Sequence, residues 1–225
     1  MKIKLLLLGV LILILASCGS SQRVGKTGAA KSARQLVTLS DEQQRKYDYF
    51  FLEATRLKGK KEYDAAFDLL KHCLTINPQA ASALYEISQY YMFLKQVPQG
   101  QAALEEAVES APDNYWYSQA LASLYQQQNE KEKAIGLLET MATRFPGKRE
   151  SLFALLDLYN QQEDYGKVIG TLDRLEEIMG KNEQLTMEKF RIYLQMKDDK
   201  SAFREIENLV KEYPMDMRYQ VILGD

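Results

Sequence analysis

Few side chains in this 225-residue sequence could do chemistry: two cysteines, Cys18 and Cys73, and one histidine, His72. A structural zinc site needs three or four ligands, and a disulfide framework needs more than two thiols. His72 and Cys73 are adjacent, and adjacent residues of a helix point in different directions. The sequence therefore predicts neither a metal site nor a cofactor.

No arrangement typical of an active site is present in the sequence either. There is no glycine-rich phosphate loop, and the single histidine has no serine or cysteine placed to form a nucleophilic pair with it. Acidic pairs such as Glu105-Glu106 and Glu176-Glu177 are typical of solvent-facing helix surfaces. We therefore expect that the protein is not an enzyme.

Cys18 directly follows a short apolar segment. The chain begins with the basic residues Lys2 and Lys4, and residues 5–16 form an apolar run that only Gly9 interrupts. A membrane-spanning helix needs about 20 apolar residues, so this run is too short to cross a bilayer. A basic start, a short apolar centre and small residues at the end are typical of an export signal.

The residues Leu15-Ala16-Ser17-Cys18 resemble the lipobox of bacterial lipoproteins, in which a branched residue and two small ones precede a cysteine. The resemblance implies that residues 1–17 are removed as a signal peptide and that the Cys18 sulfur carries a diacylglycerol. Two or three acyl chains anchor a protein stably, whereas one gives only marginal binding. The alternative is an ordinary secretory signal that happens to contain a cysteine.

Residues 18–39 are predicted to be a flexible tether, because they are rich in small and polar residues and show no apolar periodicity. Their bases either rest against anionic headgroups or are simply solvated. No aspartate follows Cys18-Gly19, and the lipoprotein resemblance implies that such an aspartate retains proteins at the inner membrane. We therefore expect a lipid anchor in the bacterial outer membrane, on the periplasmic side rather than the surface.

The charge of the chain is unevenly distributed. Residues 1–39 hold six bases and no acid, which leaves 23 bases and 31 acids, a formal charge of −8, for residues 40–225. An acidic body repels nucleic-acid backbones, and no basic stripe with interleaved aromatic residues is present. We therefore expect no nucleic-acid partner.

Prolines and tyrosines recur at one constant interval in the rest of the chain. Pro78, Pro112 and Pro146 are evenly spaced, and Pro214 follows two periods later with Gly180 at the skipped position. Tyrosines at the same interval are Tyr91, Tyr125, Tyr159 and Tyr193. A fixed period of about 34 residues is typical of stacked repeats, and two apolar stripes at helical spacing within each period predict a helical hairpin.

This pattern resembles the tetratricopeptide repeat, whose signature includes a leucine, a small residue and a tyrosine in the first helix, then an alanine, a large apolar residue and a proline. The resemblance implies an all-α fold, an α-α superhelix of about five helix-turn-helix repeats over residues 40–216. The expected units are 47–80, 81–114, 115–148, 149–182 and 183–216.

Four sets of equivalent positions carry the resemblance. The first-helix leucine positions are Glu53, Ile87, Leu121, Leu155 and Lys189, and the small positions that follow are Ala54, Ser88, Ala122, Leu156 and Phe190. The second-helix small positions are Ala66, Gly100, Ala134, Val168 and Ala202, and the large ones are Leu70, Leu104, Leu138, Leu172 and Ile206. Five of these residues depart from the pattern: Glu53, Lys189, Leu156, Phe190 and Val168.

The helical region is predicted to begin with a capping box formed by Ser40 and Gln43. Turns inside the five units are expected at 58–61, 96–98, 129–131, 163–165 and 198–200. Leu223-Gly224 lies one period beyond Lys189-Phe190, so residues 217–225 are expected to start a further repeat, truncated in a fragment of a longer protein.

In the tetratricopeptide family, the first helix of each unit usually lines a concave groove. Carried over by spacing, one groove row is Phe51, Tyr85, Gln119, Phe153 and Met187, and the neighbouring row is Thr55, Gln89, Ser123, Asp157 and Arg191. Family members that clamp a terminal carboxylate use lysine and asparagine here, so these rows do not support such a clamp. The aromatic residues either anchor a peptide or pack between units, and the spacing leaves both open.

The leading hypothesis is a lipid-anchored cell-envelope scaffold that binds protein or peptide partners through its repeats, in envelope or outer-membrane complex assembly. One alternative is a glycan-capturing lipoprotein that docks on an outer-membrane transporter. Another is the non-catalytic part of a longer enzyme.

Overall fold

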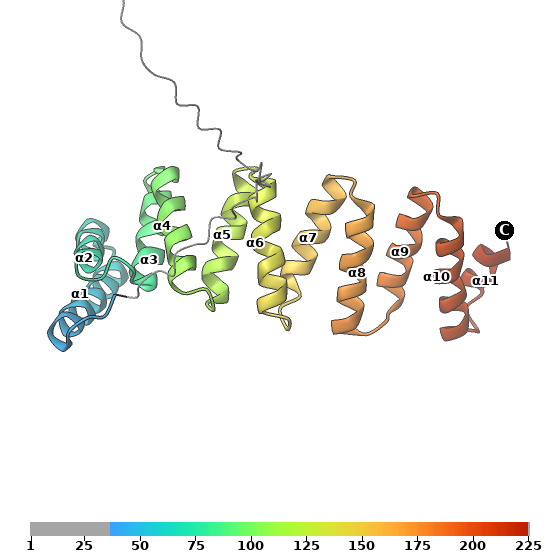
Figure 1. Ribbon diagram of the computed structural model, residues 1–225, viewed down its shortest axis with the longest axis horizontal. Helices are drawn as coiled ribbons and strands as arrows, with labels where there is room; N and C mark the ends of the chain where they lie inside the picture. The colour runs from blue at the N-terminus through green and yellow to red at the C-terminus, as the bar shows by residue number, and fades with distance from the viewer. Residues whose placement is uncertain (1–36, 225) are drawn as a thin grey trace, which may run out of the picture. The chain divides into compact units, whose positions relative to one another are not determined.

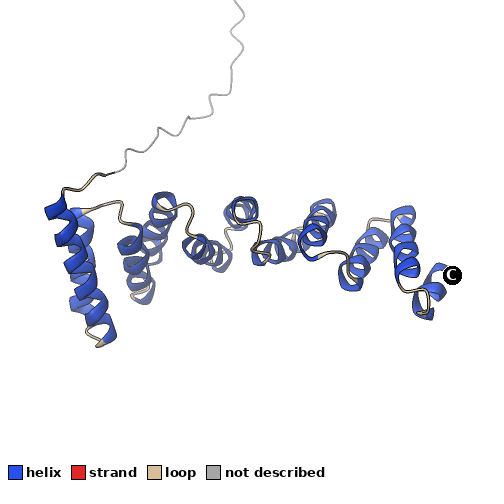
Figure 2. Cartoon of the chain, turned by 90° about the horizontal axis from the view of Figure 1, so that it is seen from below, coloured by secondary structure: helices blue, strands red, loops and turns tan. Residues whose placement is uncertain are grey.

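The computed structural model describes residues 37–224, and these residues form eleven helices and no strand (Figures 1 and 2). The all-α prediction is confirmed. The expected signal peptide, Cys18 and most of the expected tether lie outside the described residues. The helices are α1 (Asp41–Gly59), α2 (Tyr63–Ile76), α3 (Ala81–Phe93), α4 (Val97–Ser110), α5 (Tyr115–Gln127), α6 (Lys131–Arg144), α7 (Glu150–Gln161), α8 (Tyr165–Met179), α9 (Glu183–Gln195), α10 (Asp199–Glu212) and α11 (Met217–Gly224).

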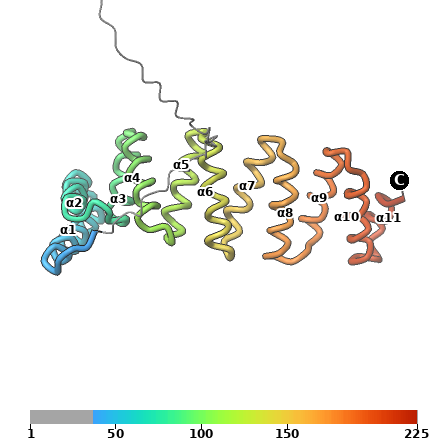
Figure 3. Tube along the Cα trace, in the orientation of Figure 1, coloured from blue at the N-terminus to red at the C-terminus, as the bar shows by residue number. Residues whose placement is uncertain are grey.

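Each helix packs against the next one along the chain, from α1 to α11 (Figure 3). The core is correspondingly distributed: one cluster runs from Tyr47 to Tyr90, a larger one from Leu104 to Ile192, and a third contains Ile206, Leu209 and Tyr219. Among residues 37–224, no helix has both the length and the hydropathy needed to cross a bilayer.

The predicted repeat positions form this core. The second-helix small positions are buried in all five pairs, and Ala66, Ala134 and Val168 have no exposed surface. A Cβ added to Gly100 would lie 3.2 Å from the Ser88 carbonyl oxygen, so the backbones of α3 and α4 approach closely here. The large second-helix positions are also buried: Leu70, Leu104, Leu138, Leu172 and Ile206.

A left-handed residue follows the first helix of every pair. Lys61, Lys95, Asn129, Glu163 and Lys197 are separated by the repeat period and have φ between 56° and 66°. The N–H of each following residue donates to a carbonyl five residues back, as in Glu130 N to Tyr125 O at 2.8 Å. This Schellman geometry closes the helix ends. The predicted positions of the turns are wrong by one or two residues, because this motif, and not the nearest polar run, fixes where each first helix stops. Pro98, expected in a turn, lies inside the first turn of α4, where proline is tolerated.

Helix ends elsewhere follow local chemistry. The capping box is confirmed: Ser40 Oγ accepts from Gln43 N at 3.2 Å, and Gln43 Oε1 accepts from Ser40 N at 2.9 Å. The helices α2, α4, α6 and α10 all end two residues before their proline, which disfavours helix in the residue that precedes it. After α8 the proline position of the repeat is occupied by Gly180, whose φ of 77° is a conformation that suits glycine.

Tyrosine hydroxyls join successive pairs. Tyr125 on α5 donates to Glu105 on α4 at 2.9 Å, and one period later Tyr159 on α7 donates to Glu139 on α6 at 2.8 Å. The Nζ atoms of Lys133 and Lys167, also one period apart, lie 5.3 and 5.1 Å from the centres of these rings. The repeated tyrosine thus contributes both apolar surface and a hydrogen bond to the neighbouring unit.

The hydrogen bond between Tyr159 and Glu139 should make the stability of the protein depend on pH in the alkaline range. Burial, followed by the hydrogen bond to Glu139, raises the pKa of Tyr159 to about 12, above the usual value near 10. Between these values the unfolded chain binds fewer protons, so the free energy of unfolding falls as pH rises from 10 to 12, and this contribution is intact below 10. In Tyr159→Phe, urea unfolding should show a flatter decline over this range and a loss of about 1 kcal/mol at pH 8.

The matched control is Tyr49→Phe on α1, because Tyr49 is 65% exposed. Its stability profile should follow that of the wild-type protein. An unchanged alkaline slope in Tyr159→Phe would contradict the proposed role of this hydroxyl.

Candidate functional site

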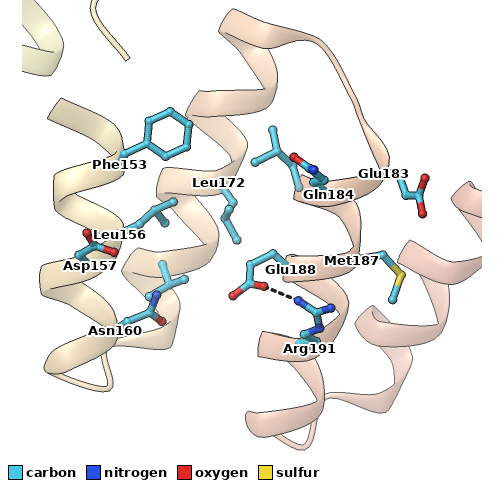
Figure 4. Close-up of a pocket in the computed structure, with 12 residues that line it drawn as sticks. Phe153, Leu156, Asp157, Asn160, Leu172, Glu183, Gln184, Met187, Glu188 and Arg191 are labelled. Atoms are coloured by element: carbon cyan, nitrogen blue, oxygen red, sulfur yellow. Dashed lines mark hydrogen bonds and ion pairs between the residues drawn. The ribbon is translucent and has the colours of Figure 1, made fainter. Parts of the chain in front are cut away.

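A surface pocket of about 480 Å³ lies between α7 and α9, above α8 (Figure 4). Its floor is apolar: Leu156 is half-buried, and Val168 and Leu172 reach it from the core. Phe153 is 42% exposed and stands at one side. The remaining lining residues are Asp157, Asn160, Glu183, Gln184, Leu185, Met187, Glu188 and Arg191.

The polar groups around this floor are mostly paired. Arg191 Nη1 donates to Glu188 Oε2 at 3.0 Å within α9, and Arg218 Nη2 donates to Glu183 Oε1 at 3.2 Å. Asp157 is exposed on α7, and Asn160 lies one turn further along the same helix. The pocket therefore combines an apolar surface with amide and carboxylate groups, which suits binding better than catalysis.

A buried lysine, Lys189, directly follows the lining residue Glu188 and fixes α9 against α8. The Lys189 side chain is only 7% exposed, and its Nζ lies 2.5 Å from Asp173 Oδ1 and 2.6 Å from Glu176 Oε2, both on α8. Burial alone would lower the pKa of Lys189, but its hydrogen bonds to these two carboxylates, together with their charges, raise it overall. The lysine thus remains charged where the three preceding units have leucine or isoleucine. Asn182 caps α9 by accepting from Leu185 N at 3.1 Å.

Comparison with known proteins identifies the fold. Residues 57–124 match the family model of the tetratricopeptide repeat. The described chain has the fold of a tetratricopeptide-repeat superhelix. Among curated proteins, none matches it.

Several solved tetratricopeptide structures are similar. A tetratricopeptide repeat protein from Parabacteroides merdae ATCC 43184 is 18% identical with a TM-score of 0.54, over 78% of this chain and 70% of its own. YrrB, described as a TPR protein with an unusual peptide-binding site, is 13% identical with a TM-score of 0.53, and the match covers 82% of this chain and 95% of YrrB. MamA is 15% identical with a TM-score of 0.54, and the match covers 78% of this chain and 96% of MamA. At these identities the likeness shows the fold alone.

The structure brings four of the ten predicted groove residues together. Phe153 and Asp157 from α7 and Met187 and Arg191 from α9 all line the pocket, two from each predicted row. Met187 also packs against the C-terminal core cluster, so this residue has a packing role as well.

The other six lie elsewhere along the tetratricopeptide stack. Phe51 stacks on Tyr47, and Tyr85 stacks on Tyr117 with ring centres 4.8 Å apart, so these aromatics pack in the way that the sequence left open. Thr55 donates to the Phe51 carbonyl, Gln119 accepts from Tyr115 Oη, and Ser123 is half-buried.

Gln89 lines a second, smaller hollow of about 240 Å³. The other lining residues are Lys58, Tyr63, Tyr90 and Phe93, and Phe93 is 79% exposed. The Tyr90 hydroxyl is buried and has no hydrogen-bond partner within residues 37–224. Lys58 is already engaged, because its Nζ lies 2.6 Å from Glu86 Oε2.

The cysteine and the histidine that could do chemistry, Cys73 and His72, line neither pocket. Cys73 has no exposed surface, and burial raises the pKa of its thiol to about 11. His72 is exposed and lies edge-on to Phe50, with ring centres 4.4 Å apart. Within the described part of the chain, no three histidine, cysteine or acidic side chains are placed to hold a metal ion.

Several residues of the main pocket escape prediction from the sequence. Leu156 departs from the small position of its unit, but the spacing does not indicate that it contributes to the floor. Glu183, Gln184 and Glu188 belong to neither predicted row. Glu183 and Gln184 precede Met187 by four and three residues, and Glu188 precedes Arg191 by three, so extending both rows by helical spacing would have found them.

Lys189 provides a test of the α8–α9 joint. We expect Lys189→Met to lower the free energy of unfolding by about 3 kcal/mol, because Glu176, with 11% of its side chain exposed, loses its partner. The double variant Lys189→Leu/Glu176→Leu restores an apolar contact and should recover most of this loss. Denaturant unfolding measures both.

Lys211→Met is the control, since Lys211 is exposed on α10 and its loss should change stability by less than about 0.5 kcal/mol. If Lys189→Met lowers the free energy of unfolding no more than this control does, the buried ion pairs do not hold α9 against α8.

Proposed function

We propose that this protein is an adaptor that holds a peptide segment of a protein partner in the pocket between α7 and α9. Tetratricopeptide proteins are generally non-catalytic adaptors, and the pocket has the composition of a binding site. Its volume of about 480 Å³ lies within the usual range of about 300–1,000 Å³ for ligand pockets. That space accepts a few side chains of an extended or helical peptide.

The observation that carries this proposal is the convergence of both predicted rows on one pocket. Phe153 and Met187 provide apolar contacts, while Asp157 and Arg191 provide polar ones, from α7 and α9. The ion pairs of Lys189 hold α9 against α8. Pre-organised apolar contact with a polar rim is the general design of peptide recognition. The similar protein YrrB is described as having a peptide-binding site, which supports the same class of function for this chain.

Blocking the pocket tests this proposal. Twelve-residue random peptides displayed on phage are selected on the purified full-length protein, and the enriched peptides are then measured as fluorescent synthetic peptides. Asn160→Trp places a large ring at the pocket and should weaken their binding about tenfold or more, equivalent to about 1.4 kcal/mol.

The matched control is Gln161→Trp, because Gln161 is the exposed neighbour on α7 and does not line the pocket. Its affinities should stay within about twofold of wild type. Failure to enrich any peptide, or equal binding by both tryptophan variants, would contradict a peptide site here.

We further propose that the adaptor is anchored by lipid at Cys18 to the bacterial outer membrane, on the periplasmic side. The support is the sequence Leu15-Ala16-Ser17-Cys18 behind a basic, apolar start. A tether of about 20 residues would keep the repeats close to the membrane and raise the local concentration of envelope partners. The protein would then serve as a scaffold in the assembly of envelope complexes.

Cys18→Ser tests the anchor. The wild-type protein should incorporate labelled palmitate and sediment with membranes, whereas the Cys18→Ser variant should lose the label and move largely to the soluble fraction. Ser20→Ala, two residues further on, should behave as wild type. A Cys18→Ser variant that keeps the label and still pellets would show that lipid at this residue is not the anchor.

A further inference from the structure

The main pocket contains one carboxylate without a partner. Asp157 is exposed on α7, and within residues 37–224 its side chain makes no hydrogen bond or ion pair. The other charged residues of the pocket are engaged: Glu188 with Arg191 at 3.0 Å, and Glu183 with Arg218 at 3.2 Å. The pocket therefore offers an incoming ligand one uncompensated negative charge.

This charge adjoins the apolar floor. Asp157 directly follows Leu156 in α7, and Phe153 lies one turn before it (Figure 4). Leu156, Leu172 and Asp157 all line this pocket, so a ligand group that contacts the two leucines occupies the same pocket as the Asp157 carboxylate. The only base among the lining residues is Arg191, whose charge Glu188 already offsets, so an acidic ligand gains little in the same place.

The net charge of the whole helical region, like the charge of Asp157, favours a cationic ligand. Residues 40–225 carry a formal charge of −8, so their field attracts cations and repels acidic peptides. Long-range attraction increases the association rate, and the local contact with Asp157 decides which residue of the peptide is favoured.

We infer that the peptide bound in this pocket carries a lysine or arginine beside a bulky apolar residue. The apolar side chain packs on Leu156 and Leu172, and the cationic group pairs with Asp157. This inference rests on the peptide-binding function proposed above and adds the chemistry of the partner. An exposed ion pair contributes modestly, so we expect it to set a preference of about three- to fivefold and not to carry the whole affinity.

A charge-reversal selection tests the inference. The same library of random twelve-residue peptides is selected on the wild-type protein and on Asp157→Lys. Peptides enriched by the wild type should contain more lysine and arginine than the input library, next to leucine, isoleucine, phenylalanine or methionine. Selection on Asp157→Lys should enrich aspartate and glutamate instead.

Two further variants separate the local contact from the overall field. Glu177→Lys changes the net charge by the same amount at an exposed position of α8 outside the pocket, and should keep the wild-type preference. Asp157→Asn removes the charge with little change in size, and should abolish the preference without reversing it. In the wild type, the preference should also weaken as salt is raised.

The outcomes distinguish this inference from the proposed function. Enriched peptides that bind in the pocket, as shown by sensitivity to Asn160→Trp, but show no preference for cations would overturn the inference and leave the function standing. An equal shift of preference in Glu177→Lys and Asp157→Lys would also overturn it, because the field alone would then explain the selection. If no peptide is enriched, the function itself fails.

Discussion

Each helix pair of this protein has an apolar face that only the next pair can cover. The large core cluster illustrates this, because it runs without interruption from Leu104 on α4 to Ile192 on α9. The constraint explains why buried positions recur with the period of the repeat, since each unit must present the same surface to its neighbours. It also explains why the joints carry specific bonds, such as Tyr125 to Glu105 and Tyr159 to Glu139, in addition to apolar contact.

The same constraint accounts for where a pocket can form. Two departures from the repeat contribute directly to it: Leu156, at a position where earlier units have alanine or serine, and Val168, where others have alanine or glycine. A third departure, Lys189, replaces the apolar residue of earlier units with two ion pairs between α9 and α8. Larger side chains thus stand where earlier units have small residues, and they contribute to the apolar floor of the pocket.

Much of the fold could be predicted from the sequence because the repeat is a packing rule. Ala66, Ala134 and Leu138 are buried as their spacing indicates, and the cap at Ser40 has the predicted geometry. The site was less predictable. The positions of Tyr85 and Phe153 are equivalent in sequence, yet Tyr85 stacks on Tyr117 while Phe153 remains exposed at the pocket, because their neighbours on the next unit differ. Side-chain partners across a joint are not encoded in the spacing of one helix.

Lys189 shows how such a cross-joint partner changes the interpretation of a residue. By sequence it is a charged residue in an apolar position, and alone it would be costly to bury. The two carboxylates that neutralise it, Asp173 and Glu176, lie on the preceding helix and occupy positions that look like ordinary solvent-facing acids. Their engagement contrasts with Asp157, which belongs to the same pair of units and has no such partner within residues 37–224. The carboxylates that hold this joint thus differ from the one that we propose contacts a peptide in that a lysine of the next helix faces them.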